Sequence, residues 1–112
     1  MLTSGQIGAA VCRAAALLDK TLPDWFSRVD LAALDMASPT RDVLGQLFGT
    51  AGRGLLAVMA ANPSVRFSSA DNGFFLTAKE RRRAQGVRKG WILTDEWVNQ
   101  IESRRLLAAE RN

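Results

Sequence analysis

Residues 3–23 of the chain, TSGQIGAAVCRAAALLDKTLP, predict an amphipathic helix, and this helix decides the fold class. Thr3 and Gln6 have the spacing of a capping box, in which each side chain accepts a hydrogen bond from the backbone amide of the other residue. Pro23 is expected to end the helix, because proline disfavours helical geometry in the residue before it. Apolar residues recur every three or four positions and predict one buried face, made of Ile7, Val11, Ala14, Leu18 and Leu22.

The residues after the first helix predict an aromatic pair that packs over the core, and then a second helix. Trp25 and Phe26 follow the first helix directly, and an aromatic pair at such a position usually folds back over the core. Residues 29–36 combine strand-like alternation with helical spacing, which predicts either a short helical turn or an extended connector. The serine–proline pair at 38–39 suits a helix start and Gly49 suits its end. The buried side of this helix is expected to be Val43, Leu44, Leu47 and Phe48.

A glycine-rich stretch, residues 49–54, separates that helix from an apolar run, residues 55–61. The run predicts a third, short helix that ends at Asn62 and Pro63. We interpret the glycines as a turn between two helices. The alternative, a phosphate-binding loop, lacks the Gly-Lys-Ser/Thr of a P-loop and does not follow a predicted strand. The sequence therefore favours the plain turn.

The last third of the chain has a less regular secondary-structure pattern. Residues 64–76 contain an Asp-Asn-Gly turn at 71–73 between short apolar pieces, so they fit either a small hairpin or a short helix that ends at Gly73. A final helix is predicted from Thr94, which suits an N-cap ahead of two acidic residues, and residues 107–112 are expected to fray. The buried side of this helix is expected to be Trp97, Val98 and Ile101.

The composition is that of a globular domain. Apolar residues make up 47% of the chain and charged residues 23%, which is ordinary for a folded protein. We predict a mainly α fold, with one small compact domain over residues 1–112, about four helices and, in the hairpin alternative, a short β-hairpin near residues 65–76. No apolar run approaches the roughly 18 residues of a membrane span, and no secretion signal is recognisable. We therefore expect a cytoplasmic protein without a membrane partner.

The absence of histidine limits the chemistry that this chain can perform. Ser/His/Asp and Cys/His nucleophile systems, histidine general bases and nearly all zinc sites need imidazoles or several thiolates. The one cysteine, Cys12, stands among small apolar residues of the first helix and is expected to be a buried, reduced thiol. The aspartates of the first half fit local roles as caps and turn residues: Asp19, Asp24, Asp30, Asp35 and Asp42. We predict no catalytic residue, no cofactor and no metal site.

Positive charge is concentrated in one segment. Residues 79–89 carry six basic side chains and one acidic side chain, whereas the rest of the chain carries nine basic and ten acidic ones. Such a cluster can neutralise phosphates of nucleic acid or attract an acidic partner. Alternatively, residues 77–90 are a solvated basic loop or insertion, or residues 78–90 are a ragged extension of a helix, since charge runs are usually solvated. Trp91, the nearest aromatic residue, is expected to be buried. The candidate contact residues are Lys79, Arg81, Arg82, Arg83, Arg88 and Lys89.

A succession of short pieces spans most of the chain: residues 18–19, 23–25, 29–31, 34–36, 43–49, 73–74 and 93–97. The most specific piece is LGQLFG at residues 44–49, which follows LDM at residues 34–36. In this succession the chain resembles a family of small uncharacterised proteins encoded by actinobacterial phages and prophages, of the mycobacteriophage kind. The resemblance implies a phage setting and no particular activity. Physically, Gly45 is expected to let another segment approach closely, and Gln46 to point outward or to satisfy a neighbouring backbone group.

Two hypotheses about function follow. The first is a non-enzymatic interaction module that binds a host or phage protein, either as a single copy or as a homo-oligomer. The alternative is binding of nucleic acid through residues 79–89.

Overall fold

The computed structural model describes residues 3–65, 73–74, 76, 80 and 84–111. These residues form helices joined by turns, without a strand, which confirms the mainly α fold class. The hairpin expected as one alternative near residues 65–76 falls mostly on residues outside the described part. The helices are α1 (Ser4–Thr21), α2 (Trp25–Arg28), α3 (Val43–Phe48), α4 (Ala51–Ala61) and α6 (Ala84–Arg111).

Helix α1 begins with the predicted capping box. The Thr3 hydroxyl accepts a hydrogen bond from the Gln6 amide at 3.1 Å, and Gln6 Oε1 accepts one from the Thr3 amide at 2.8 Å. The helix ends at Thr21, and the amide of Leu22 closes the last turn on the carbonyl of Leu18. Each end of α1 is therefore fixed by hydrogen bonds between residues that lie within a few positions of that end.

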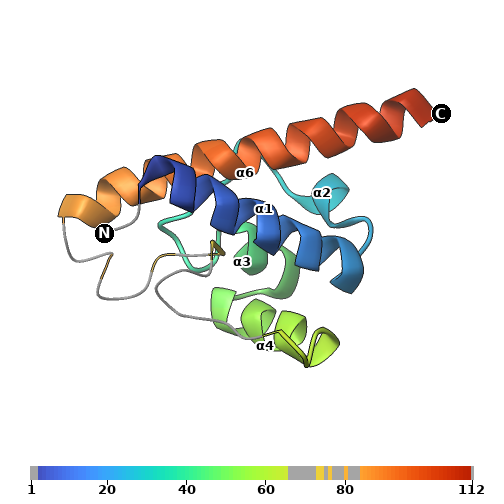
Figure 1. The fold of residues 1–112 in the computed structure, drawn as a ribbon, viewed down its shortest axis with the longest axis horizontal. Coiled ribbons are helices and arrows are strands. Elements are labelled where there is room, and N and C mark those ends of the chain that lie inside the picture. The colour runs from blue at the N-terminus through green and yellow to red at the C-terminus, as the bar shows by residue number, and fades with distance from the viewer. Residues whose placement is uncertain (1–2, 66–72, 75, 77–79, 81–83, 112) are drawn as a thin grey trace.

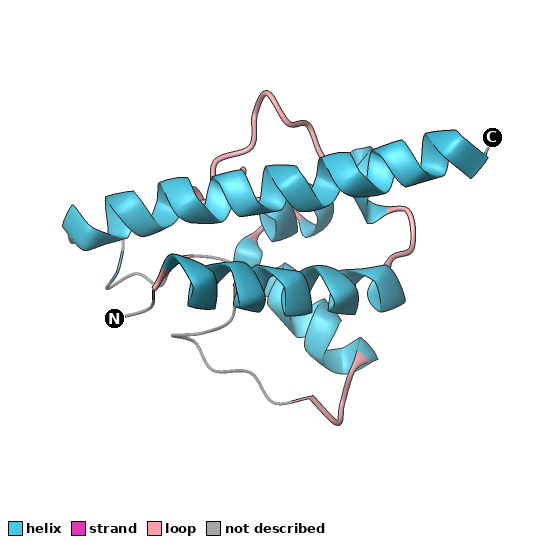
Figure 2. Cartoon of the chain, turned by 45° about the horizontal axis from the view of Figure 1, so that its top comes forward, coloured by secondary structure: helices cyan, strands magenta, loops and turns pink. Residues whose placement is uncertain are grey.

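The helices pack in layers around α1. Helix α6 lies beside α1 and runs in the same direction, while α4 packs against α1 on another side (Figure 1). Helix α3 packs on α4, and α2 packs on α6. The last turns of α6 project beyond the other helices in both views (Figure 2). None of the described helices is long and apolar enough to cross a membrane.

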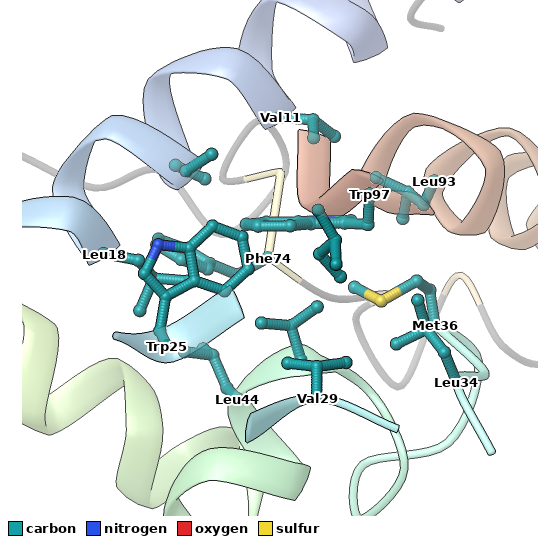
Figure 3. Close-up of a cluster of buried hydrophobic side chains, with 14 of the residues drawn as sticks. Val11, Leu18, Trp25, Val29, Leu34, Met36, Leu44, Phe74, Leu93 and Trp97 are labelled. Atoms are coloured by element: carbon teal, nitrogen blue, oxygen red, sulfur yellow. The ribbon is translucent and has the colours of Figure 1, made fainter. Parts of the chain in front are cut away.

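Three aromatic side chains occupy the centre of the core (Figure 3). The ring of Trp97 meets Trp25 edge to face at 5.6 Å and stacks on Phe74 at 5.9 Å, and all three side chains are fully buried. The indole N–H of Trp97 donates to the Gly73 carbonyl at 2.8 Å, so burial leaves no unpaired donor on this ring. The expectation that Trp25 and Phe26 cover the core is confirmed, with Phe26 half-buried.

Helix α3 begins four residues later than predicted. Its N-cap is Asp42, whose carboxylate accepts the Gly45 amide at 2.6 Å, whereas Ser38 belongs to a preceding turn that the Asp42 amide closes. Aspartate at the cap also favours the positive end of the helix. Gly45 does permit a close approach, because a Cβ there would stand 2.5 Å from the Pro39 carbonyl oxygen. Gly49 ends the helix with a φ of 96°, as expected for glycine.

Gln46 joins α3 to the connector before it. Its side chain accepts the amide of Asp30 at 2.7 Å and donates to the carbonyls of Asp30 and Arg41, each at 3.1 Å. Gln46 therefore satisfies neighbouring backbone groups, which is the second of the two expectations for it. Asp30 in turn accepts the Ala32 amide at 3.0 Å, so the connector forms the helical turn alternative.

The glycine-rich stretch is mostly helical. Helix α4 begins at Ala51, and the Thr50 hydroxyl caps it by accepting the Arg53 amide at 3.2 Å. The expected turn is therefore shorter than residues 49–54. Gly54 lies inside the helix, where a Cβ would stand 2.6 Å from the Leu44 Cβ, so this glycine sets how closely α3 and α4 approach.

Helix α6 begins ten residues before the predicted start. Thr94 lies in its interior, where its hydroxyl donates to the Gly90 carbonyl at 2.8 Å and accepts the Met36 amide at 3.2 Å. Residues 84–90 of the expected basic segment form the first turns of this helix, so for them the structure fits the helix-extension alternative and not the loop. Residues 107–111, for which fraying was expected, continue the same helix.

Candidate interaction surface on helix α6

The outward side of α6 carries an exposed tryptophan between charges of opposite sign. Val87, Arg88, Trp91 and Asp95 are separated by one, three and four residues, which places them within about 100° of one another around the helix axis. We call these four residues the α6 outer face. Trp91 is 70% exposed and Val87 is 50% exposed, and both charged residues are exposed.

The buried side of α6 explains why Trp91 faces outward. Leu93, Trp97 and Ile101 are fully buried and recur every four residues. Trp91 precedes Leu93 by two positions, about 200° around the axis, and therefore lies on the side of the helix away from Leu93. The expectation that Trp91 is buried is wrong. Extending the helical period upstream from Leu93 would have placed Trp91 correctly.

The structure describes two of the six basic candidate residues, and they have different environments. Arg88 is exposed on the α6 outer face. Lys89 is half-buried, and its ammonium group donates to the Glu80 carboxylate in an ion pair. The remaining candidates lie outside the described residues: Lys79, Arg81, Arg82 and Arg83.

An ion-pair cluster fixes the C-terminal half of α6 on α1 and α2. Arg104 donates two hydrogen bonds to the Asp19 carboxylate, at 2.9 and 2.8 Å, and its guanidinium group lies 5.5 Å from the centre of the Trp25 ring. The indole N–H of Trp25 also donates to Asp19, at 2.9 Å. Burial raises the pKa of Asp19, but the hydrogen bonds from Arg104 and Trp25, with the charge of Arg104, outweigh it and lower this pKa below its ordinary 3.8.

The neighbouring arginine adds a second contact to α2. Arg105 Nε donates to the Phe26 carbonyl at 3.0 Å, and its Nη2 donates to the Val29 carbonyl at 2.5 Å. These acceptors lie at the C-terminal end of α2, where a cation is favourable. Together, Arg104 and Arg105 fix the rotation of α6, and hence which residues form the α6 outer face.

The described acidic and thiol side chains have other positions and roles. No group of three or more metal-binding side chains occurs among the residues that the structure describes. Asp35 accepts the Ala37 amide and pairs with Arg41 at 3.3 Å, which is a local turn contact. Cys12 is exposed, so the expectation of a buried thiol is wrong. It follows the buried Val11 by one position, about 100° around the helix, and so leaves the buried stripe.

Two further groups of apolar side chains are exposed. On α4, Leu56 is 68% exposed and Met59 is 41% exposed. On the projecting end of α6, Leu106 is 62% exposed and Leu107 is 54% exposed. Leu56 is thus about as accessible as Trp91 and offers a matched comparison for it.

Comparison with protein-family models, with curated proteins and with solved structures finds no match to this chain.

Proposed function

We propose that this protein is a non-enzymatic binding module of phage origin that recognises a host or phage protein in the cytoplasm of a bacterial host through the α6 outer face. The observation that supports this proposal is the 70% exposure of Trp91 in the interior of a long helix. Tryptophan and arginine are enriched among the residues that contribute most to protein–protein binding. Trp91 also stands on an element fixed by Arg104 and Arg105, so little conformational freedom is lost when a partner covers it.

The remaining residues of the α6 outer face suit the edge of such an interface. Val87 lies one turn before Trp91 and extends its apolar surface. Arg88 and Asp95 flank the tryptophan with opposite charges, and charges at the edge of an interface mainly provide orientation and selectivity. The arrangement therefore favours a protein partner whose surface has an apolar centre bordered by both signs of charge.

The test compares two equally exposed apolar residues on different helices. We expect that a protein retained from host extract by the unmodified chain is lost with Trp91→Ala, with affinity lowered about tenfold or more, and is kept with Leu56→Ala. Both variants should melt close to the unmodified protein, since neither side chain is in the core. Retention of the same proteins by Trp91→Ala would show that the α6 outer face is not the binding surface.

Binding of nucleic acid is the second candidate, and the exposure of Trp91 is the observation that favours it. An exposed aromatic ring beside a cation offers a base both stacking and phosphate contact, and Arg88 stands three residues from Trp91. The ion pair of Lys89 with Glu80 and the exposed Asp95 reduce the positive charge nearby. These two features place this candidate second.

Titration of labelled single-stranded DNA and RNA with the protein tests the second candidate. We expect binding that weakens steeply with salt, that is lost when Arg81, Arg82 and Arg83 are all replaced with alanine, and that is weakened by Trp91→Ala. The melting temperature of the triple variant should stay unchanged. If the unmodified protein shows no salt-dependent binding, this candidate is wrong.

A further inference from the structure

We propose that the α6 outer face binds a second copy of this chain, with the two α6 helices packed antiparallel about a two-fold axis beside Trp91. This inference rests on the proposed function, since it names the partner of the same surface. It is argued from the order of charge along the helix. Arg88 lies three residues before Trp91 and Asp95 lies four residues after it. Among the residues that the structure describes, neither of these two charges has an ion-pair partner.

This order makes the α6 outer face complementary to itself. An antiparallel partner presents its residues in reverse, so Arg88 meets the partner's Asp95, and Asp95 meets the partner's Arg88. The two positions are seven residues apart, about 10 Å along the helix, and the two ion pairs therefore stand on either side of the tryptophans. A parallel arrangement would instead bring like charges together.

The apolar part of the surface fits the same arrangement. With the axis beside Trp91, the two indole rings lie next to each other at the centre, where aromatic side chains contribute most to an interface. Val87, one turn away on the same side, is 50% exposed and adds apolar surface that a partner would cover. Helix α6 lies along one edge of the fold, so a second copy can approach it lengthwise (Figure 1).

The charge on the α6 outer face also favours a second copy over a polyanion or an acidic peptide. Either of those would place negative charge against Asp95, which is exposed on this surface. A second copy leaves both Arg88 and Asp95 opposite a charge of the other sign. Because the surface covers only a few turns of one helix, the interface is small, and we expect an association that depends on protein concentration.

Sedimentation of charge-reversed variants tests the arrangement. We expect the unmodified chain to shift from the mass of one copy toward that of two as its concentration rises. Arg88→Asp alone and Asp95→Arg alone should remain single copies at the same concentrations, since each puts like charges together twice. An equal mixture of these two variants should associate again. In the mixed pair, the aspartate introduced in one variant meets the arginine introduced in the other, and the two unchanged charges also meet with opposite signs. The variant that carries both substitutions should associate as well.

Three outcomes would overturn the inference. One is an unmodified chain that remains a single copy up to a protein concentration of about 1 mM. Another is a mixture of the two variants that associates no more than each variant alone. The third is association that persists in Trp91→Ala. If the chain stays a single copy but retains a host protein in a Trp91-dependent way, self-association is wrong and the proposed function stands. Self-association without any retained host protein supports the inference and shows that the partner of the α6 outer face is a second copy of the chain and not a host protein.

Discussion

Replacing Thr94 with valine removes a hydroxyl that connects α6 to the connector before α3. This hydroxyl accepts the Met36 amide at 3.2 Å and donates to the Gly90 carbonyl at 2.8 Å. Met36 is fully buried, so its amide cannot turn to water when the acceptor is lost. Valine has nearly the shape of threonine and a similar preference for the helix, and the hydrogen bond is therefore the main difference between the two proteins.

The expected loss of unfolding free energy is about 1–3 kcal/mol, the cost of leaving a buried backbone donor without an acceptor. This is a large part of the total, since a domain is stable by only about 5–15 kcal/mol. At about 4 °C per kcal/mol for a chain of this size, the melting temperature should fall by about 4–12 °C.

Two further variants of Thr94 separate its observed role from that of an N-cap. Serine keeps the hydroxyl and should cost little. Glycine would cost only a few tenths of a kcal/mol in total at an N-cap, but in a helix interior its lower helix propensity adds a few tenths of a kcal/mol, relative to threonine, to the lost hydrogen bond. Chemical denaturation should therefore rank the proteins in the order threonine, serine, valine, glycine. A valine variant with an unchanged midpoint, or a glycine variant more stable than the valine one, would refute this reasoning.

Two other predictions concern stability. The pKa of Asp19 is lowered in the folded state, so this side chain contributes stability at neutral pH. The contribution is present above about pH 4 and is lost as the pH falls below 3.8, the ordinary pKa of this group, and through its lowered pKa in the folded protein. Arg104→Gln should flatten this part of the pH profile of urea unfolding. The change in unfolding free energy should stay below about 1 kcal/mol because the Asp19 side chain is 43% exposed. An unaltered profile would contradict this prediction. Gly45→Ala should destabilise the protein by about 2–3 kcal/mol, since its Cβ would lie 2.5–2.7 Å from the backbone of Pro39 and Thr40. Gly52→Ala, which meets nothing within 4 Å, should instead stabilise it by up to about 1 kcal/mol, and equal denaturation midpoints for the two variants would argue against the close contact.

Signals that act over a few residues could be predicted from the sequence. The capping box of Thr3 and Gln6 and the left-handed end at Gly49 each close within one turn of helix. The apolar stripe of α1 also follows directly from the period of the helix, because burial there depends on one face only. These elements needed no knowledge of the rest of the chain.

The sequence pattern predicts the wrong hydrogen-bonding role for residues whose partners are distant in sequence. Thr94 looks like an N-cap from its neighbours, yet the amide that it accepts belongs to Met36, 58 positions earlier. Ser38 and Pro39 also have the composition of a helix start, but Asp42 supplies the cap and the preceding residues form a turn. A local pattern shows that a residue can accept an amide and does not show which amide it accepts.

The α6 outer face could not be predicted from the sequence for the same reason, the wrong start of the final helix at Thr94. The basic segment was correctly identified as the concentration of charge, but the structure describes only Arg88 and Lys89 of its candidates, and it places Lys89 in an ion pair. A final helix that starts at Thr94 gives Trp91 no helical face, so the sequence predicts a buried position for it. The exposed tryptophan, which now supports the proposed function, was therefore not predicted.

The position of Trp97 in the core affects how the chain can fold while it is being synthesised. Its ring closes the aromatic centre formed by Trp25 and Phe74, and it lies on the last helix of the chain. A growing chain that already contains α1 to α4 lacks the edge-to-face partner of Trp25 until the residues around Trp97 leave the ribosome. The earlier helices therefore keep apolar surface exposed until α6 is available, and we expect the domain to fold as one unit.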